Sequence, residues 1–216
     1  MTDADLASAL LRHGLTLPED VVRRLQQYCL LLWDWNKRLN LTRHSDYEAF
    51  VTRDLLDTLK LSAHVPQGAK VLDVGSGGGV PGIPLAILRP DVRVSLSESV
   101  TKKSSVLQSM VQTMNVKAAV QADRAENVLK RHRFDLVMAR AVAPLSKLLT
   151  WFQPVWKSIP QMILIKGPRW TEELETARND GLLKGLSVIR IDSWPTPGRD
   201  GDSVLLSITR TPGPPR

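Results

Sequence analysis

Five glycines and two prolines lie within twelve residues of the chain, in the stretch DVGSGGGVPGIP at positions 73–84. The stretch directly follows the apolar run Val71-Leu72. A backbone so poor in side chains lets a ligand approach closely, and open α/β sheets bind their ligands beyond the carboxyl ends of the strands. The sequence therefore predicts a nucleotide-like ligand at this loop.

The spacing of the glycines separates two kinds of ligand. Counted from Gly75 and Gly77, the dinucleotide fingerprint G-x-G-x-x-G is not met, because Val80 stands where the third glycine should be. Asp73 and the glycines at 75, 77 and 79 instead fit D-x-G-x-G-x-G, which resembles the first motif of S-adenosylmethionine-dependent methyltransferases. This resemblance implies that the loop lies against the amino-acid end of the cofactor and that Asp73 holds its ammonium group. A glycine-rich turn that only packs is the alternative.

The order of the secondary structure elements predicts the fold class. Seven short β-rich runs follow one another: KVLDV, VRVSLSE, AAVQAD, FDLVMAR, QMILIKG, LSVIRI and SVLLSIT. Helical stretches separate all but the last two, which a turn-rich segment joins, so we expect a mostly parallel seven-stranded sheet with a C-terminal antiparallel hairpin. This is the α/β, Rossmann-like fold of class I S-adenosylmethionine-dependent methyltransferases.

Apolar residues at helical spacing between Val21 and Leu39 predict helices before the first strand. We therefore expect an N-terminal helical extension at 1–64, a Rossmann-like methyltransferase domain at 65–210 and a frayed tail at 211–216.

Two further segments are candidates for cofactor contacts. Glu98 ends the second β-rich run, where an acidic side chain can accept both ribose hydroxyls, although a solvated carboxylate explains it too. Ala125 and Glu126 follow the third run, at the depth where an adenine ring would lie. An acidic residue that stabilises a helix N-terminus explains Glu126 almost as well.

The charge of the chain favours a polyanionic partner. The sequence has 29 Lys and Arg against 22 Asp and Glu, a formal net charge of +7. Six basic residues follow β-rich runs and should gather at the carboxyl edge of the sheet: Lys102, Lys103, Arg124, Arg140, Lys166 and Arg169. We expect a basic rim that binds RNA, in which Arg140 and Lys166 also position the acceptor; the alternative is a set of solvated loop charges.

The absence of certain sequence motifs narrows the range of groups that the protein could methylate. The fourth run continues into Ala141-Val142-Ala143-Pro144, without the N-P-P-Y or D-P-P-Y tetrapeptide of enzymes that methylate exocyclic amines. Cys29 is the only thiol and lies in the helical extension, which disfavours a cysteine nucleophile. A ring nitrogen such as guanine N7 needs only in-line positioning. The sequence therefore predicts methyl transfer without a catalytic acid or base.

Composition also limits the setting in which the protein acts. One cysteine forms no intramolecular disulfide and no Cys-rich metal site, so we expect a reducing cytoplasm and no metal. No apolar run approaches the roughly 20 residues of a membrane span, and the N-terminus lacks a signal-peptide core. We expect a soluble monomer without a membrane partner.

Several separated segments together resemble the bacterial small-subunit ribosomal RNA methyltransferase G family, also called glucose-inhibited division protein B. The segments that carry the resemblance are Trp35-Asn36 with Asn40-Leu41-Thr42, Arg53 to Leu59, the glycine loop, Glu98-Ser99 with Lys102-Lys103, Arg124-Ala125-Glu126, Ala139-Arg140-Ala141 and Lys166-Gly167. The resemblance implies methyl transfer from S-adenosylmethionine to N7 of one guanine in the decoding-region loop of 16S rRNA, within the small subunit or an assembly intermediate.

The resemblance also completes the predicted cofactor site by implying contacts at Gly75, Val80, Ala125, Glu126 and Arg140. The expected cofactor-binding residues are thus Asp73, Gly75, Ser76, Gly77, Gly79, Val80, Glu98, Ala125, Glu126 and Arg140. One departure is Asp54, which stands where the family's histidine is expected. A methyltransferase of the same fold for a small molecule or a protein, and a non-catalytic RNA-binding ribosome assembly factor, are the alternatives.

Overall fold

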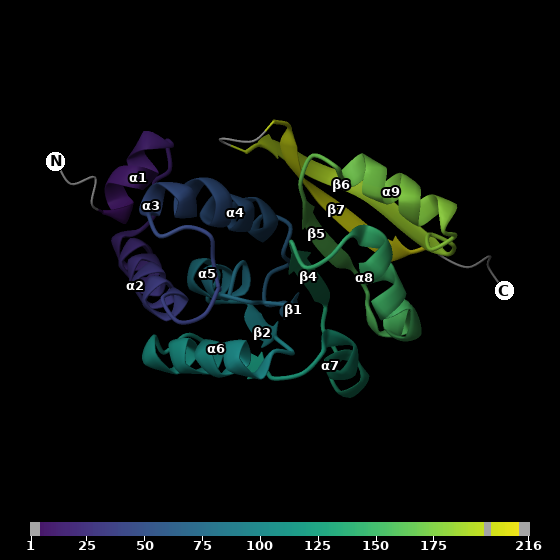
Figure 1. The fold of residues 1–216 in the computed structure, drawn as a ribbon, viewed down its shortest axis with the longest axis horizontal. Coiled ribbons are helices and arrows are strands. Elements are labelled where there is room, and N and C mark those ends of the chain that lie inside the picture. Colours follow the sequence, from purple (N-terminus) through teal and green to yellow (C-terminus); the bar gives the residue numbers. More distant parts are fainter. Residues whose placement is uncertain (1–4, 197–199, 212–216) are drawn as a thin grey trace.

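One mixed sheet of seven strands lies at the centre of the described part of the chain, residues 5–196 and 200–211 of a computed structural model. The strand order is β3-β2-β1-β4-β5-β7-β6 (Figure 1). The strands are β1 Lys70–Val74, β2 Arg93–Ser97, β3 Ala118–Gln121, β4 Leu136–Arg140, β5 Met162–Lys166, β6 Leu186–Pro195 and β7 Asp202–Arg210.

The pairing of the strands confirms the expected fold class. Strands β1 to β5 are parallel, and β7 pairs antiparallel with both β5 and β6. The strand order reverses between β1 and β4, whose ends are in register at Val74 and Ala139. Open α/β sheets bind ligands at such a switch point. The candidate site is therefore expected beyond the carboxyl ends of β1 and β4.

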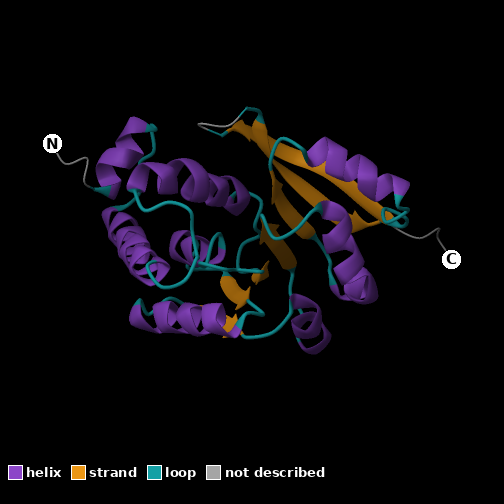
Figure 2. Cartoon of the chain, in the orientation of Figure 1, coloured by secondary structure: helices purple, strands orange, loops and turns teal. Residues whose placement is uncertain are grey.

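Helices cover both faces of the sheet, as Figure 2 shows. On one face lie α4 Leu56–Ser62, α5 Gly82–Leu88 and α6 Thr101–Thr113; on the other lie α7 Ala125–Arg131, α8 Leu145–Phe152, the short 3₁₀-helix η2 Gln153–Ser158 and α9 Trp170–Asn179. Alternate residues of a strand face opposite sides. Val71 accordingly belongs to the core under α5 and α6, and Leu72 belongs to the core under α7 and α8.

The N-terminal extension is helical, as expected. It contains α1 Leu6–Arg12, α2 Glu19–Asn36, α3 Tyr47–Ala49 and the π-helix η1 Phe50–Leu55, which continues into α4. Asp5 and Asp46 cap α1 and α3 by accepting hydrogen bonds from backbone N–H groups. The buried apolar side chains of α2 share one core with β1 and β2. The boundary at residue 64 stays a prediction, and the expected tail at 211–216 lies almost wholly outside the described residues.

Candidate functional site

The glycine loop joins β1 to α5, and its glycines have different local roles. Gly75 and Gly79 have positive φ angles of 64° and 98°, and a Cβ atom there would lie 2.9 Å from Val142 and 2.6 Å from Ile83. The positive φ angles and the close side chains together favour glycine at these two positions. Gly77, with a φ angle of 55°, is different, because an added Cβ would meet nothing closer than 3.8 Å. The open side of the loop is at Gly77.

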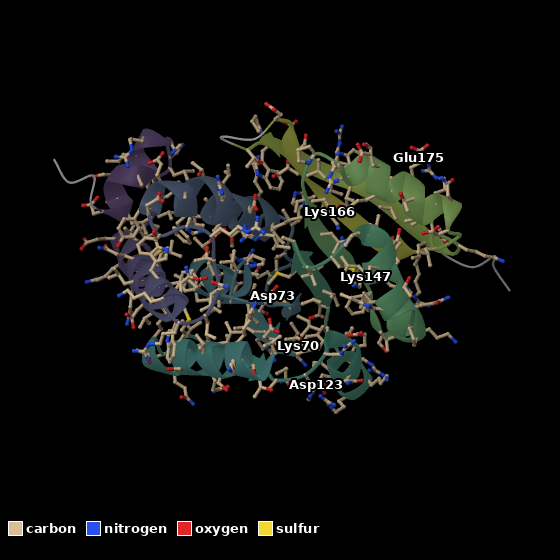
Figure 3. The ribbon with its side chains drawn as sticks, in the orientation of Figure 1. Lys70, Asp73, Asp123, Lys147, Lys166 and Glu175 are labelled. Carbon is tan, nitrogen blue, oxygen red and sulfur yellow. The ribbon has the colours of Figure 1, made fainter. Side chains whose placement is uncertain are left out.

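Asp73 lies directly beneath this loop, near the middle of the molecule (Figure 3). The side chain is fully buried, and Oδ2 accepts a hydrogen bond of 3.2 Å from the backbone N–H of Gly82. Its other oxygen, Oδ1, is buried and has no donor among the described residues. Burial raises the pKa of Asp73 to about 7. A ligand ammonium group would supply the missing donor, so the residue fits the role expected from the sequence.

The side chain of Glu98 reaches the glycine loop. The structure therefore brings together two segments that the sequence analysis assigned to one ligand site. The Oε2 of Glu98 accepts from the backbone N–H of Gly77 at 3.0 Å, and its Oε1 accepts from that of Val100 at 2.8 Å. Ser76 closes the loop onto the same strand through a bond from its N–H to the carbonyl of Ser97. A carboxylate has about four acceptor positions, so two remain for ribose hydroxyls.

The segment after β3 lies beside this carboxylate. The N–H of Glu98 donates to the carbonyl of Gln121, and the hydroxyl of Ser97 donates to that of Asp123 at 2.9 Å. Ala125 is buried at the start of α7, and Glu126 is half-buried in its first turn. The strand ends therefore bring both predicted adenine contacts to the same edge as Glu98.

Arg140, at the end of β4, is held by the N-terminal extension. Its Nη2 lies 2.7 Å from Asp54 Oδ1, and its Nη1 lies 3.1 Å from Asp57 Oδ2 and 3.0 Å from the carbonyl of Arg53. Burial opposes the charge of Asp54, but the hydrogen bond from His44 and the charge of Arg140 hold its pKa below the usual value. Burial raises the pKa of Asp57 despite the same guanidinium. The site thus contains a buried cluster of charges.

Two members of this cluster were missed by sequence reasoning. His44 Nε2 lies 2.8 Å from Asp54 Oδ2, and the indole N–H of Trp194 donates to Asp57 at 3.2 Å. The one available signal was Asp54 itself, the acid in place of the family's histidine. Asp54 sits in η1, and the π-helical turn directs both this side chain and the carbonyl of Arg53 at Arg140. Such turns are frequent at functional sites.

The extension also closes one side of the glycine loop. The hydroxyl of Tyr28 in α2 donates to the carbonyl of Gly78 at 2.9 Å. Asn36 Oδ1 accepts from the N–H groups of Leu41 and Thr42, and this turn places the Leu41 carbonyl 3.2 Å from where a Cβ of Gly78 would be. These contacts hold the extension against the glycine loop.

The expectation of six exposed basic residues needs a correction. The Nζ of Lys166 is buried and donates to the carbonyl of Ala143 and to Glu173, both at 2.7 Å. Lys166 therefore braces the turn between β4 and α8 instead of facing solvent, and Arg140 is paired as described above. The remaining basic residues lie on the surface, with Lys103 half-buried: Lys102, Lys103, Arg124 and Arg169. Their contact with RNA stays a prediction.

Two further properties of the described residues bear on the site. They contain no group of three His, Cys, Asp or Glu side chains that could hold a metal ion. None of the helices described is long and apolar enough to cross a membrane.

The fold and the glycine-loop site together define a class I S-adenosylmethionine-dependent methyltransferase. The structure is similar to that of an O-methyltransferase from Bacillus cereus in complex with SAH, with a TM-score of 0.60 and 16% identity over 94% of this chain and 97% of that one. It is also similar to precorrin-6y C5,15-methyltransferase from Geobacter metallireducens, with a TM-score of 0.55 and 13% identity over 80% and 92% of the two chains. At these identities the likeness concerns the fold alone.

Sequence comparison identifies the family. Residues 21–199 match the model of the family described as rRNA small subunit methyltransferase G. The protein of that name from Rhodopirellula baltica is 46% identical, over 90% of this chain and 84% of the relative. The one from Chromobacterium violaceum is 35% identical, over 94% and 95%. The chain belongs to the rRNA small subunit methyltransferase G family. This membership confirms the family resemblance noted in the sequence. It also confirms that the protein is an S-adenosylmethionine-dependent methyltransferase.

Proposed function

We propose that this protein methylates N7 of one guanine in the decoding-region loop of 16S rRNA, using S-adenosylmethionine. The names of the relatives from Rhodopirellula baltica and Chromobacterium violaceum describe methyltransferases of small-subunit ribosomal RNA. The net charge of +7 suits an RNA acceptor. The chemistry of the site supports the proposed acceptor atom.

The observation that supports the choice of atom is that the carboxylates around the site are paired with Arg140, hydrogen-bonded to the backbone or fully buried. Glu98 accepts from two backbone N–H groups, and Asp54 and Asp57 pair with Arg140. Asp73 is fully buried beneath the loop. None of these groups is placed to remove a proton from an acceptor. An acceptor with a free lone pair, such as guanine N7, needs no such base.

When bound, S-adenosylmethionine would supply a methyl group on a sulfonium centre, so that an N7 lone pair could form a C–N bond in exchange for the C–S bond without loss of a proton. Asp73, Gly77 and Glu98 would hold the cofactor in this arrangement. Orientation of two reactants can contribute roughly 7–11 kcal/mol to lowering a barrier. The protein's task is then positioning, which the surface residues Lys102, Lys103, Arg124 and Arg169 would perform on the RNA side.

Other acceptor classes fit these residues less well. Cys29 lies on α2, and its side chain is buried in the protein core. This burial raises the pKa of the thiol and disfavours a thiolate nucleophile. The turn after β4 contains Ala141 and Val142 where enzymes acting on exocyclic amines carry polar and aromatic residues. Neither route has its chemical group at the site.

The proposal is tested with 16S rRNA that lacks the modification. The purified protein and S-adenosylmethionine are incubated with this RNA, free or in small subunits, and the product is reduced with borohydride and cleaved with aniline. Cleavage at a single guanine supports N7 methylation. Label at an exocyclic amine, at carbon or at scattered guanines contradicts it. Cofactor binding without transfer indicates an assembly factor, and transfer only to small molecules or proteins indicates the other alternative.

A further inference from the structure

A basic hollow of about 400 Å³ lies on the α7 side of the sheet, away from the glycine loop. We name it the β1–β2 hollow after the strands that begin it. It is lined by Lys70, Arg93, Ser95, Gln121, Arg131, His132, Arg133 and Phe134. Four of these residues are cations and none is a carboxylate. The hollow is thus a concentration of positive charge that the cofactor site does not use.

The strand register places two of these cations side by side. Lys70 and Arg93 begin neighbouring parallel strands and are directly paired in the β1–β2 ladder. Their neighbours Val71 and Val94 point into the core under α5 and α6, so both cations face the α7 side. Adjacent strands are about 4.8 Å apart, and like charges directly opposite each other destabilise a sheet. An arrangement with this cost favours an anion between the two side chains.

The surrounding carboxylates compensate this charge only in part, since Asp135 accepts from the backbone N–H of Lys70 at 2.8 Å but forms no ion pair with its side chain among the described residues. Among the described residues, Arg131 pairs with Asp123 at 2.7 Å, whereas Lys70, Arg93 and Arg133 form no ion pair. Arg133 donates to the carbonyl of Leu129 at the end of α7. The cations of the hollow are exposed to solvent, so an anion can reach them.

The hollow lies at the end of α7, whose last residue, Arg131, is part of its lining. This helix has seven residues, about 10 Å of length. The sheet face there is polar, with Ser95 and Gln121 in place of apolar residues. Figure 3 labels Lys70 in the lower part of the view, in the region of β2 and α7. The first residue of α7 is the predicted adenine contact Ala125, and its last is Arg131. The hollow is therefore one short helix away from the cofactor edge.

We propose that the β1–β2 hollow binds phosphates of the RNA backbone beside the reacting loop. This inference rests on the proposed function for the identity of the polyanion. Exposed, flexible cations with a hydroxyl and an amide bind phosphate and sugar without reading a base sequence. The RNA then extends from the strand ends, past α7, to the starts of β1 and β2. Its backbone holds the register of the substrate, and the reacting base is read elsewhere.

The test compares two doubly substituted variants of equal charge. Lys70→Ala with Arg93→Ala removes the paired cations of the hollow. Arg178→Ala with Lys184→Ala removes one arginine and one lysine that are exposed at the other end of the sheet and outside the ion pairs of the described residues. Fluorescence anisotropy measures binding of a 16S rRNA fragment with the decoding-region loop at several salt concentrations, and calorimetry measures cofactor affinity.

The hollow variant should reduce the slope of log affinity against log salt by about 1.4, which is 0.7 for each single-strand phosphate that the protein no longer neutralises. The control variant should retain the wild-type slope, and both should retain the cofactor affinity. An unchanged slope in the hollow variant, or an equal reduction in the control, overturns the proposal. A third outcome would also overturn the proposal. If inorganic pyrophosphate raises the melting temperature of the wild type but not of the hollow variant, and the salt slope of the hollow variant is unchanged, the hollow is a site for small anions.

These measurements need no turnover, so the two proposals fail separately. RNA binding with the expected slopes but without N7 methylation contradicts the proposed function and leaves the hollow as an RNA-binding surface. N7 methylation with unchanged slopes contradicts only the role of the hollow.

Discussion

The raised pKa of Asp73 predicts a pH dependence for cofactor binding. The carboxyl group is fully buried, and its pKa is about 7. A cofactor ammonium group would bind the ionised form. With this pKa the ionised fraction falls from about ten in eleven at pH 8 to about one in eleven at pH 6. The affinity for the cofactor should therefore fall about tenfold between these two pH values.

The assay is calorimetric titration with S-adenosylhomocysteine at half-unit steps from pH 6 to pH 8, for the wild type and for Asp73→Asn. The variant preserves the shape of the side chain but carries no charge. It should bind more weakly at pH 8, and its affinity should lack the tenfold change. Other titrating groups act on both proteins alike, so the difference between the two profiles isolates Asp73. Parallel profiles would refute the assignment of the ammonium site.

The same pKa predicts an effect on stability of a defined sign. The pKa of Asp73 is above the unfolded value of 3.8, so folding favours the protonated form. The resulting contribution is complete below about pH 4 and is lost as the pH rises through 7, a decline of about 4 kcal/mol. Thermal melting from pH 4 to pH 8 should show the stability of Asp73→Asn rising relative to wild type. A constant difference would contradict the buried carboxyl as its source.

Three further variants, each with its own test, probe the site. Asp54→Asn breaks a buried ion pair and should cost about 3–5 kcal/mol, or about 6–20 °C in melting temperature. Asp34→Asn, in an exposed ion pair, should cost under about 1 kcal/mol; equal losses would argue against the buried cluster. Gly77→Asp should weaken cofactor affinity about a hundredfold or more, because a charge enters the open side of the loop near another carboxylate. The melting temperature should fall only by the small strain that a side chain meets at the φ angle of 55°. Gly77→Asn is its neutral control, and unchanged calorimetric affinity would remove the loop from the site. Lys102→Ala with Lys103→Ala should lower the salt slope of RNA binding by about 0.7 for each phosphate that is no longer neutralised and leave cofactor affinity intact; an unaltered slope would mean that both are only solvated.

Much of the fold could be predicted from the sequence because its signals are local. Alternating apolar residues decide which side of a strand is buried, and the turn-rich segment between the last two runs predicts an antiparallel hairpin. The insertion of β7 between β5 and β6 is a non-local pairing. The glycine spacing likewise predicts the type of cofactor, since positive φ angles at Gly75 and Gly79 are backbone requirements of the turn itself.

The sequence did not predict which charged residues face solvent. Arg140 and Lys166 end strands, and Lys102 follows one in the first turn of α6; all were expected together at one basic rim. The partner of Arg140 lies 86 residues earlier in the chain, in a π-helical turn that the local pattern does not indicate. The partner of Lys166 is Glu173 in the following helix. Both side chains are buried because a partner close in space compensates the cost of burying their charge.

By itself, the sequence determined the class of fold, the cofactor loop and the family, because these depend on residue types at fixed spacings along the chain. The tertiary structure decided that Gly77 is the open position of the loop and that Asp73 has an unpaired buried oxygen. It also decided that Lys70 and Arg93 stand side by side in a hollow. The physical reason is that burial, and with it the energy of a charge, depends on distances between segments far apart in the chain.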